Sequence, residues 1–318
     1  MLVREMVRAD RQAVLDLLEH AFGVRELFER YMDFDPAFSY GDLVLALEDG
    51  EPVACVQVFD KTIRLRGESV RLGGIGGVAT RASHRGRGVS SDLLERALER
   101  MRAKEMWLSL LFAAPIAPLY ERLGWHKIPA PQLRLSPKRR DAQVTPAGRA
   151  FQPQDLDAVT RLYDAYVAPL SGPTVRDARY WRGQLRTAGT PEEDFRVAER
   201  GGVLTAYSRV ATFNGRPRVL EYARSPDGAD GLAELLASRA PGEHALYAPV
   251  VRDPELADAL ARHGVDVSLA QDPSPMWRVI ERAPLARLAG VTGSTSDFEL
   301  LSALVADGAA TYWPSDRF

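Results

Sequence analysis

Few of the features that mark specialised protein classes occur in this chain of 318 residues. Its single cysteine, Cys55, cannot form an intramolecular disulfide, and the alternating apolar run VACVQVF around it favours a small core residue. No apolar run approaches the length of a membrane-spanning helix, and the N-terminal segment MLVREMVRAD has no apolar signal core. We therefore expect a cytoplasmic protein that does not insert into membranes.

The chain also lacks an excess of charge and any pattern of metal ligands. Lysine and arginine number 41 and aspartate and glutamate 43, so the formal net charge is −2, which argues against a dedicated nucleic-acid binder. No spacing of cysteine, histidine or carboxylate residues suits a metal ion. The five histidines are scattered, and we expect each to be structural or exposed: His20, His84, His126, His244 and His263.

What remains is the composition of an ordinary globular protein, with 46% hydrophobic and 26% charged residues. The length suits two domains, with a small third piece.

The most informative stretch runs from Arg71 to Leu94, RLGGIGGVATRASHRGRGVSSDLL. It indicates a buried strand, a turn rich in glycine and arginine, and the start of a helix. The N–H groups of such a turn and the dipole of the following helix favour an anionic ligand. In isolation the same pattern also fits an ordinary surface loop.

Periodicity around this stretch predicts alternating strands and helices. A polar, proline-broken segment, Ser136–Ala150, is the candidate linker to the second half. In the first half we expect strands at LVREMV, Leu43–Leu47, Pro52–Phe59 and Trp107–Phe112, and helices at Arg11–Phe22, Ser90–Lys104 and Ile116–Leu123, with Val24–Phe38 as a helix or lid.

The second half repeats this order closely enough to suggest an internal duplication. A tail from Met276 to Phe318 follows, with a helix expected near Ser296–Ala306. The expected elements of the second half are a helix in FQPQDLDAVTRLYDAYV, strands at FRVAE, Leu204–Phe213, Arg218–Ala223 and HALYAPV, and helices at GLAELLASR and PELADALARHG.

Three features of the first half resemble the GCN5-related N-acetyltransferase (GNAT) superfamily. The turn RGRGVS has the R-x-x-G-x-(small) spacing of its acyl-CoA-binding motif, and YERLGW resembles its tyrosine-bearing helix. The upstream segment VREMVRADRQAVLDLLEHAFG resembles the family's first strand and helix. The resemblance covers about Met1–Leu135. It implies an α/β (α+β) fold of two GNAT-like domains, each with a mixed, mostly antiparallel sheet flanked by helices, plus a short C-terminal appendage.

The resemblance also implies acetyl-CoA as cosubstrate and no metal. The pyrophosphate needs consecutive N–H groups and small side chains where it lies close, as at Gly86, Gly88 and Ser90, while Arg85 and Arg87 can add charge. Val78 and Ala79 would offer main-chain groups to the pantetheine arm. The full set of expected cofactor-binding residues is Val78, Ala79, Thr80, Arg85, Gly86, Arg87, Gly88, Val89, Ser90 and Ser91.

In this family an amine attacks the thioester directly. Tyr120, in YERLGW, is the candidate acid for the departing thiolate; the alternative is an aromatic residue that only packs between helix and sheet. A base is less evident, because the strand LGGIGGVAT has no carboxylate or imidazole. His84 lies in the turn and fits a surface loop residue better than a base.

A GNAT domain followed by a degenerate one resembles the Eis-like (enhanced intracellular survival) acetyltransferases. In that group the terminal carboxylate enters the first active site, so we expect the carboxylate of Phe318, after the rigid pair Trp313-Pro314, to act as base or substrate anchor. The alternative is an unanchored end. That group usually carries a full sterol-carrier-like C-terminal domain, and we expect a truncated C-terminal region here. The resemblance also implies assembly into homo-oligomers.

The second half lacks the machinery of the first. At the position of the glycine turn, Pro226 removes an N–H donor and Asp227 repels phosphate, and Leu260 stands where the first half has Tyr120. We expect a catalytic domain at 1–140, a non-catalytic GNAT-like domain at 147–283 and a segment at 284–318 that reaches the active site.

For the amine acceptor, a small molecule or a peptide, we expect the acidic and aromatic segment after Gly23 to form the pocket. Glu26, Glu29, Asp33 and Phe34 are the candidate substrate-binding residues. The alternative is a solvated amphipathic helix.

The sequence thus predicts an N-acetyltransferase. Its main rival is a non-catalytic acyl-CoA-binding regulatory protein, which would bind the same cosubstrate without releasing thiol. A dinucleotide-dependent oxidoreductase fits poorly, because the turn is not G-x-G-x-x-G.

Overall fold

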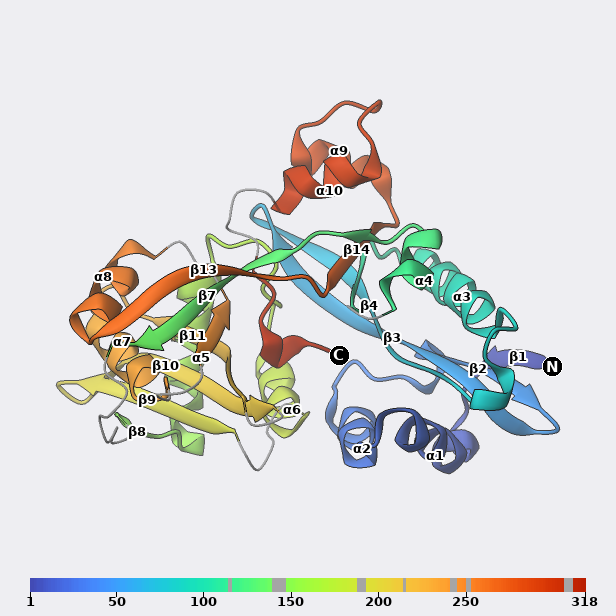
Figure 1. Cartoon of the computed structure of the whole chain (residues 1–318), viewed down its shortest axis with the longest axis horizontal. Coiled ribbons are helices and arrows are strands. Elements are labelled where there is room, and N and C mark those ends of the chain that lie inside the picture. Colours follow the sequence, from blue (N-terminus) through green and yellow to red (C-terminus); the bar gives the residue numbers. More distant parts are fainter. Residues whose placement is uncertain are drawn as a thin grey trace.

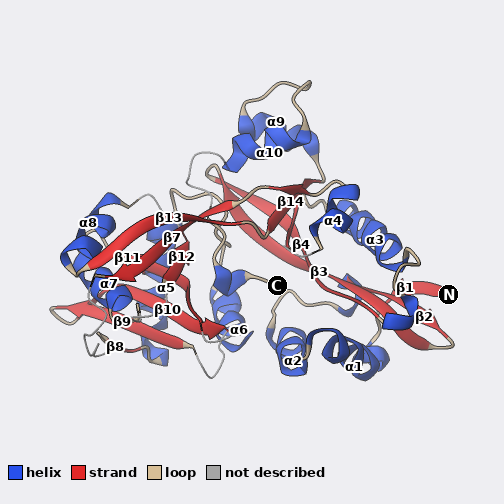
Figure 2. Ribbon diagram, viewed as in Figure 1, coloured by secondary structure: helices blue, strands red, loops and turns tan. Residues whose placement is uncertain are grey.

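The computed structural model describes residues 1–113, 116–138, 147–187, 193–213, 216–240, 245–249, 253–305 and 311–318. Two seven-stranded sheets flanked by helices lie side by side, and the C-terminal residues lie between them (Figure 1). Figure 2 shows the same arrangement by element type. No helix within the described ranges is both long and apolar enough to cross a bilayer.

The first sheet has the order β1-β2-β3-β4-β5-β14-β6, and its only parallel pair is β4 with β5. Its strands are β1 (Leu2–Glu5), β2 (Leu43–Glu48), β3 (Glu51–Leu65), β4 (Glu68–Thr80), β5 (Leu108–Phe112), β6 (His126–Lys127) and β14 (Pro275–Val279).

The second sheet has the order β13-β7-β12-β11-β10-β9-β8, and its only parallel pair is β11 with β12. Its strands are β7 (Ala130–Pro137), β8 (Arg149–Ala150), β9 (Asp194–Arg200), β10 (Val203–Phe213), β11 (Arg216–Arg224), β12 (Leu246–Pro249) and β13 (Val265–Asp272).

The two halves of the chain exchange one strand each. β7, which follows the first GNAT-like half, lies between β12 and β13 of the second sheet, and β14, from the end of the second half, lies between β5 and β6 of the first (Figure 1). Read from β1 and from β8, the two sheets therefore have equivalent orders. The exchange ties the sheets together through the backbone.

The predicted internal duplication extends to side chains. Arg4 donates to Asp10 at 2.6 and 2.8 Å, and Arg149 donates to Asp155 at the same two distances. Each aspartate also accepts a backbone N–H three residues earlier, at 2.8 Å. The same short turn thus opens the first helix of each half.

Helices cover the first sheet in three groups, each with its own apolar cluster. α3 and α4 pack on one face, where Val44, Ala46 and Ile75 point. α1 and α2 cover the other face at one end, and α9 and α10 cover that face at the other end. The α-helices of both halves together are α1 (Arg11–Phe22), α2 (Arg25–Phe34), α3 (Val89–Ala103), α4 (Ala117–Arg122), α5 (Leu156–Val167), α6 (Ala178–Thr187), α7 (Ala229–Ala237), α8 (Pro254–Arg262), α9 (Arg282–Ala289) and α10 (Asp297–Val305).

The predicted fold class is confirmed, and several elements have the predicted bounds. The helix at Arg11–Phe22 is α1, and Gly23 ends it in the left-handed region at φ 73°. Helices α6 and α9 and strands β13 and β14 were not predicted. The helix expected near Ser296–Ala306 is α10; residue 306, most of the predicted linker (139–146) and His244 lie outside the described residues.

Sheet membership also departs from the predicted division at 1–140, 147–283 and 284–318. Residues 130–137 pair in the second sheet and residues 275–279 in the first, because the halves exchange strands. A division along the sequence therefore does not separate the two sheets.

Candidate active site

The first feature of the site is a split between β4 and β5. The two strands pair only at Leu72–Leu108, Gly73–Ser109 and Gly74–Leu110, although β4 continues to Thr80 along β3. From Ile75 onward the β5 side of β4 has no ladder partner among the described strands. Its main-chain groups are therefore open to a ligand.

A β-bulge changes the course of β4 at this split. The register between β3 and β4 shifts between Cys55 and Gln57, and Gly77 takes a φ of +57°, which a residue with a side chain adopts only under strain. The thiol of Cys55 donates to the carbonyl of Gly77 at 3.3 Å. Burial raises the pKa of Cys55 to about 12, so this thiol is an unreactive core group, as expected from sequence.

The glycine turn after β4 opens a hollow at the N-terminus of α3. Most of the predicted cofactor-binding residues line it, and Leu119 and Arg122 of α4 close its other side. The Thr80 and Ser90 hydroxyls hydrogen-bond at 2.7 Å, and Arg85 donates to the Thr80 carbonyl at 3.2 Å. The predicted residues on the hollow are Thr80, Arg85, Gly86, Gly88, Val89, Ser90 and Ser91; Val78, Ala79 and Arg87 do not line it.

The equivalent turn of the second half is closed. A Cβ on Gly86 or Gly88 would meet no heavy atom within 4 Å, whereas a Cβ on Gly228 would collide with the Thr205 carbonyl, whose carbon would lie 2.9 Å away. The N–H of Ser225 also donates to that carbonyl at 2.8 Å. The carbonyl of Thr205 on β10 therefore lies against Gly228, whereas Gly86 and Gly88 of the first half have open space beside them.

Tyr120 lies on α4, between the hollow-lining residues Leu119 and Arg122. Its side chain packs in the α3 cluster, edge-on to Trp125 with ring centroids 6.1 Å apart. Burial raises the pKa of Tyr120 to about 12, so the phenol keeps its proton throughout the physiological range.

Phe318, the last residue of this sequence, packs on β4 at the split. Its ring stacks on Phe59 with centroids 5.3 Å apart and contacts Phe112 and Tyr312. A Cβ on Gly76 would lie 3.0 Å from the carboxyl carbon of Phe318, and a Cβ on Gly74 would overlap its ring. These two glycines make room for the residue.

The two predicted catalytic residues lie on opposite faces of the first sheet. A Cβ on Gly73 would meet Met101 of α3, on the face where Tyr120 packs, while Gly74 and Gly76 face Phe318. Residues of a strand alternate between faces, so the gap between β4 and β5 is the direct route between the two groups.

A buried network in the second half fixes the C-terminal segment. The guanidinium of Arg176 donates to Glu221 and to Asp316, each at 2.7 Å, and all three side chains are fully buried. Tyr180 donates to Asp316 at 3.1 Å, and Gln184 donates to the Ser315 carbonyl at 2.9 Å. Trp313 is fully buried in the same core. The segment is therefore anchored in the second half and ends in the first.

Glu221 gives this network a pH dependence. Burial alone would raise its pKa, but Arg176 and Arg209 outweigh burial and lower the pKa to about 2. Because its pKa is lower in the folded state, ionised Glu221 stabilises the folded protein at pH values above the ordinary pKa of 4.5. This stabilisation is lost as the pH falls toward 2. We expect Glu221→Gln to destabilise the protein by about 3 kcal/mol at pH 7, and the deficit to shrink below pH 4.5.

Denaturant unfolding at several pH values measures this effect. Glu234→Gln, at an exposed position of α7, is the matched control and should change the unfolding free energy by less than about 0.5 kcal/mol. A Glu221→Gln deficit that stays constant from pH 7 to pH 3 would contradict the assignment.

The predicted acidic pocket residues do not line the site. Glu29 pairs with Arg25 at 2.9 Å, Asp33 pairs with Arg11 at 2.8 Å, and Glu26 is exposed. Phe34 packs under the guanidinium of Arg186, 3.5 Å from its ring centroid. The structure brings Glu26, Glu29, Asp33 and Phe34 to the outside of α2 and its contact with α6.

Two other residues of the same segment reach inward. The hydroxyl of Tyr31 donates to the carbonyl of Arg317 at 2.9 Å, so α2 holds the C-terminal segment directly. Asp35 accepts from Lys61 at 3.0 Å, and both side chains are buried. The aromatic and acidic composition drew attention to this segment. The side chains that point inward from it are Tyr31 and Asp35, and not the four predicted residues.

His84 also differs from its expected surface position. It is buried, its Nε2 lies 2.7 Å from Glu48 and its Nδ1 lies 2.9 Å from Ser83. The imidazole therefore braces the turn, and His84 is also one of the residues that line the hollow.

Sequence reasoning missed the groups that place Phe318: Gly74, Gly76, Phe59, Phe112 and the Arg176 network. The one available signal was the alternation of glycines in LGGIGG, because glycines two apart on a strand lie on one face and admit a close neighbour there. Within the described residues no group of three or more histidine, cysteine or acidic side chains could hold a metal ion.

Comparisons with known proteins agree with this geometry. Residues 2–128 match the acetyltransferase (GNAT) domain model. An uncharacterised N-acetyltransferase of Streptomyces coelicolor is 32% identical over 244 residues, which cover 70% of this chain and 56% of that protein. The chain thus matches little more than half of this relative's length.

Solved structures share the fold over most of the chain. A GCN5-related N-acetyltransferase from Kribbella flavida aligns with a TM-score of 0.64 at 19% identity, over 91% of this chain and 72% of that one. Eis1 from Mycobacterium abscessus aligns with a TM-score of 0.61 at 15% identity, over 90% and 75%. Residues 2–128 therefore match the GNAT acetyltransferase domain, and the chain shares the fold of these solved structures over most of its length.

Proposed function

We propose that the chain is an acetyl-CoA-dependent N-acetyltransferase in which a primary amine attacks the thioester directly. The observation that carries this proposal is the split between β4 and β5, which leads to an open glycine turn at the N-terminus of α3. An acetyltransferase domain model matches the same residues.

The hollow fits the pyrophosphate of CoA. Gly86 and Gly88 leave open space where a side chain would stand, and the first N–H groups of α3 have no partner within the helix. Arg85 and Arg122 add positive charge. On this model the unpaired edge of β4, including Val78, Ala79 and Thr80, hydrogen-bonds the pantetheine arm, and Arg87 and Ser91 extend the anion site.

The amine must lose a proton before it attacks. For a lysine-like amine, with a pKa of roughly 10.4, deprotonation at pH 7 costs on the order of 4–5 kcal/mol. We propose that the carboxylate of Phe318, next to Gly76, accepts that proton or positions the amine. Tyr120, the candidate acid, then donates a hydrogen bond to the departing thiolate as its negative charge develops.

In this proposal the second half serves as a scaffold. Its closed turn at Gly228 supports a non-catalytic role, and its buried network supports a role in holding the C-terminal segment. The proposal therefore assigns acetyl transfer to the first half alone.

The main alternative is a protein that binds acyl-CoA without transferring the acyl group. Incubation with acetyl-CoA and a panel of amines, including polyamines, aminoglycosides and lysine peptides, separates the two. We expect free thiol to appear only when a suitable amine is present. Tight acetyl-CoA binding without amine-dependent thiol release across the panel would favour the alternative.

A further inference from the structure

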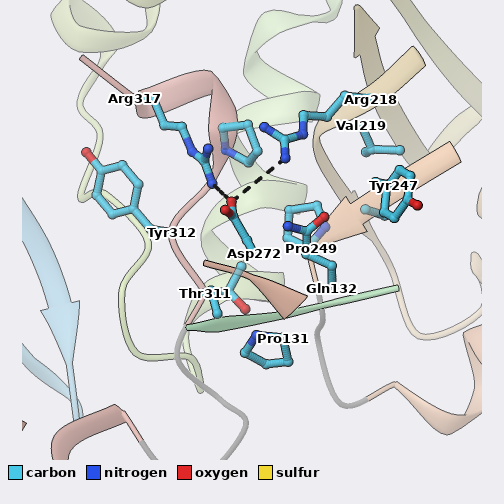
Figure 3. Close-up of a pocket in the computed structure, with 13 residues that line it drawn as sticks. Pro131, Gln132, Arg218, Val219, Tyr247, Pro249, Asp272, Thr311, Tyr312 and Arg317 are labelled. Carbon is cyan, nitrogen blue, oxygen red and sulfur yellow. Dashed lines mark hydrogen bonds and ion pairs between the residues drawn. The ribbon is translucent and has the colours of Figure 1, made fainter. Parts of the chain in front are cut away.

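A pocket lies where the second sheet meets the C-terminal segment (Figure 3). It opens beside a larger apolar chamber, and the two share five lining residues: Ala130, Pro131, Thr311, Tyr312 and Arg317. Figure 3 shows Arg218, Arg317 and Asp272 converging at the centre of this pocket.

The charges in the pocket do not balance. Asp272 is its only acidic residue in the described part of the chain, and two guanidinium groups face it. One oxygen of Asp272 accepts from the N–H and hydroxyl of Ser274, at 3.0 and 2.6 Å, and the other accepts from Arg317. Arg218 reaches the second oxygen only at 3.8 Å, beyond hydrogen-bond distance. One positive charge is left over.

Both guanidinium groups also have donors to spare. Nε of Arg317 is buried and has no hydrogen-bond partner among the described residues. Burial and the like charge of Arg317 lower the pKa of Arg218, although Asp272 partly opposes this. A carboxylate is the group that a guanidinium fork recognises through paired hydrogen bonds.

The adjoining chamber is apolar. Its apolar lining residues include Leu65, Leu110, Phe112, Ile128, Pro129, Pro275 and Trp277. A ligand that spans both spaces therefore needs an apolar body and an anionic end.

We propose that this pocket binds an organic monocarboxylate, with its carboxylate on the N–H groups of Arg218 and Arg317 that Asp272 does not use, and its apolar body in the chamber. The single excess positive charge matches a monoanion. A phosphate dianion would leave a negative charge in the pocket.

The site adjoins the candidate active site. Phe112 and Tyr312 line the chamber and also contact the ring of Phe318, and Arg317 is the preceding residue. The carboxylate can therefore belong to the acceptor amine itself or to a separate ligand. Only this choice of source rests on the proposed function.

Titration calorimetry with hexanoate and hexanamide tests the site without any turnover. We expect hexanoate to bind the wild type at least tenfold more tightly than hexanamide. Arg218→Gln should weaken hexanoate about tenfold and leave hexanamide unchanged, whereas Arg200→Gln, at an exposed position of β9, should change neither. Equal binding of the two ligands, or an unchanged affinity in Arg218→Gln, would overturn the proposal.

Kinetics then identify the source. If the carboxylate belongs to the acceptor, 6-aminohexanoate should be acetylated with a lower KM than hexylamine, and Arg218→Gln should remove that preference. If it belongs to a separate ligand, hexanoate should alter the rate without competing with the amine. Both results support the site. Absence of turnover with every amine would count against the proposed function and leave the calorimetric result standing.

Discussion

A chain extended by one glycine after Phe318 should transfer acetyl groups at least 100-fold more slowly than the wild type. The added residue turns the terminal carboxylate into a peptide group and keeps the aromatic ring. The ring stacks on Phe59, and the carboxyl carbon would lie 3.0 Å from a Cβ on Gly76, so the carboxylate sits against β4 at the split. Loss of a positioned base typically costs about 10²–10⁴ in rate.

Removal of Phe318 should have the same effect, because it withdraws both ring and carboxylate. Acetyl-CoA binding should be unchanged in both chains, since the glycine turn and α3 form a separate hollow. Initial rates of thiol release, with acetyl-CoA affinity measured alongside, report the outcome. An extended chain that keeps the wild-type rate would exclude the carboxylate from the reaction.

A matched pair of glycine variants on β4 tests the role of Phe318 independently. Gly74→Ala would place a methyl group within 2.5 Å of the Phe318 ring and displace it. Gly73→Ala would instead press on Met101 of α3, 2.6 Å away, which costs stability without touching Phe318. We expect only the first variant to lose activity beyond its loss of stability.

Tyr120→Phe is expected to lower kcat about 10²–10⁴-fold and to leave acetyl-CoA affinity nearly unchanged. The substitution removes only the hydroxyl, so the contacts of the ring with Trp125 and the α3 cluster are kept. The pKa of about 12 means that Tyr120 stays protonated throughout a usual assay range. It should therefore not produce an alkaline fall in kcat in that range.

The raised pKa of Tyr120 also indicates whether the residue transfers its proton or only donates a hydrogen bond. A free thiol has a pKa of about 8.5, so full proton transfer from Tyr120 to a solvated thiolate would be unfavourable by roughly 5 kcal/mol. Burial also raises the basicity of a thiolate, which narrows the gap. Hydrogen bonding as the charge develops is thus the first contribution of Tyr120. A variant with wild-type kcat would reduce this tyrosine to a packing residue.

Local chemistry predicted much of the fold and the glycine turn that borders the hollow at α3. Helical periodicity and Gly23 set the bounds of α1, and glycines with small neighbours marked the turn at Arg85–Ser91. Long-range pairing could not be predicted in this way. The exchange of β7 and β14, and the contact of Arg176 with Asp316 140 residues away, depend on which surfaces meet after folding.

The acceptor side illustrates the same limit. Composition drew attention to the segment after Gly23, but helix packing turned Tyr31 inward and left Glu26 in solvent. The basic pocket around Arg218 was not anticipated, because its residues come from four strands and the C-terminal segment. Each carries an ordinary local pattern in the sequence.

Transfer of an acetyl group from acetyl-CoA to an amine is the reaction proposed for this chain. Incubation with trideuterated acetyl-CoA and the amine panel, followed by mass spectrometry of the amines, tests it most directly. We expect at least one amine to gain the mass of one trideuterated acetyl group with the wild type and to be labelled far less with Tyr120→Phe. An enzyme that binds acetyl-CoA while every amine stays unlabelled would contradict it.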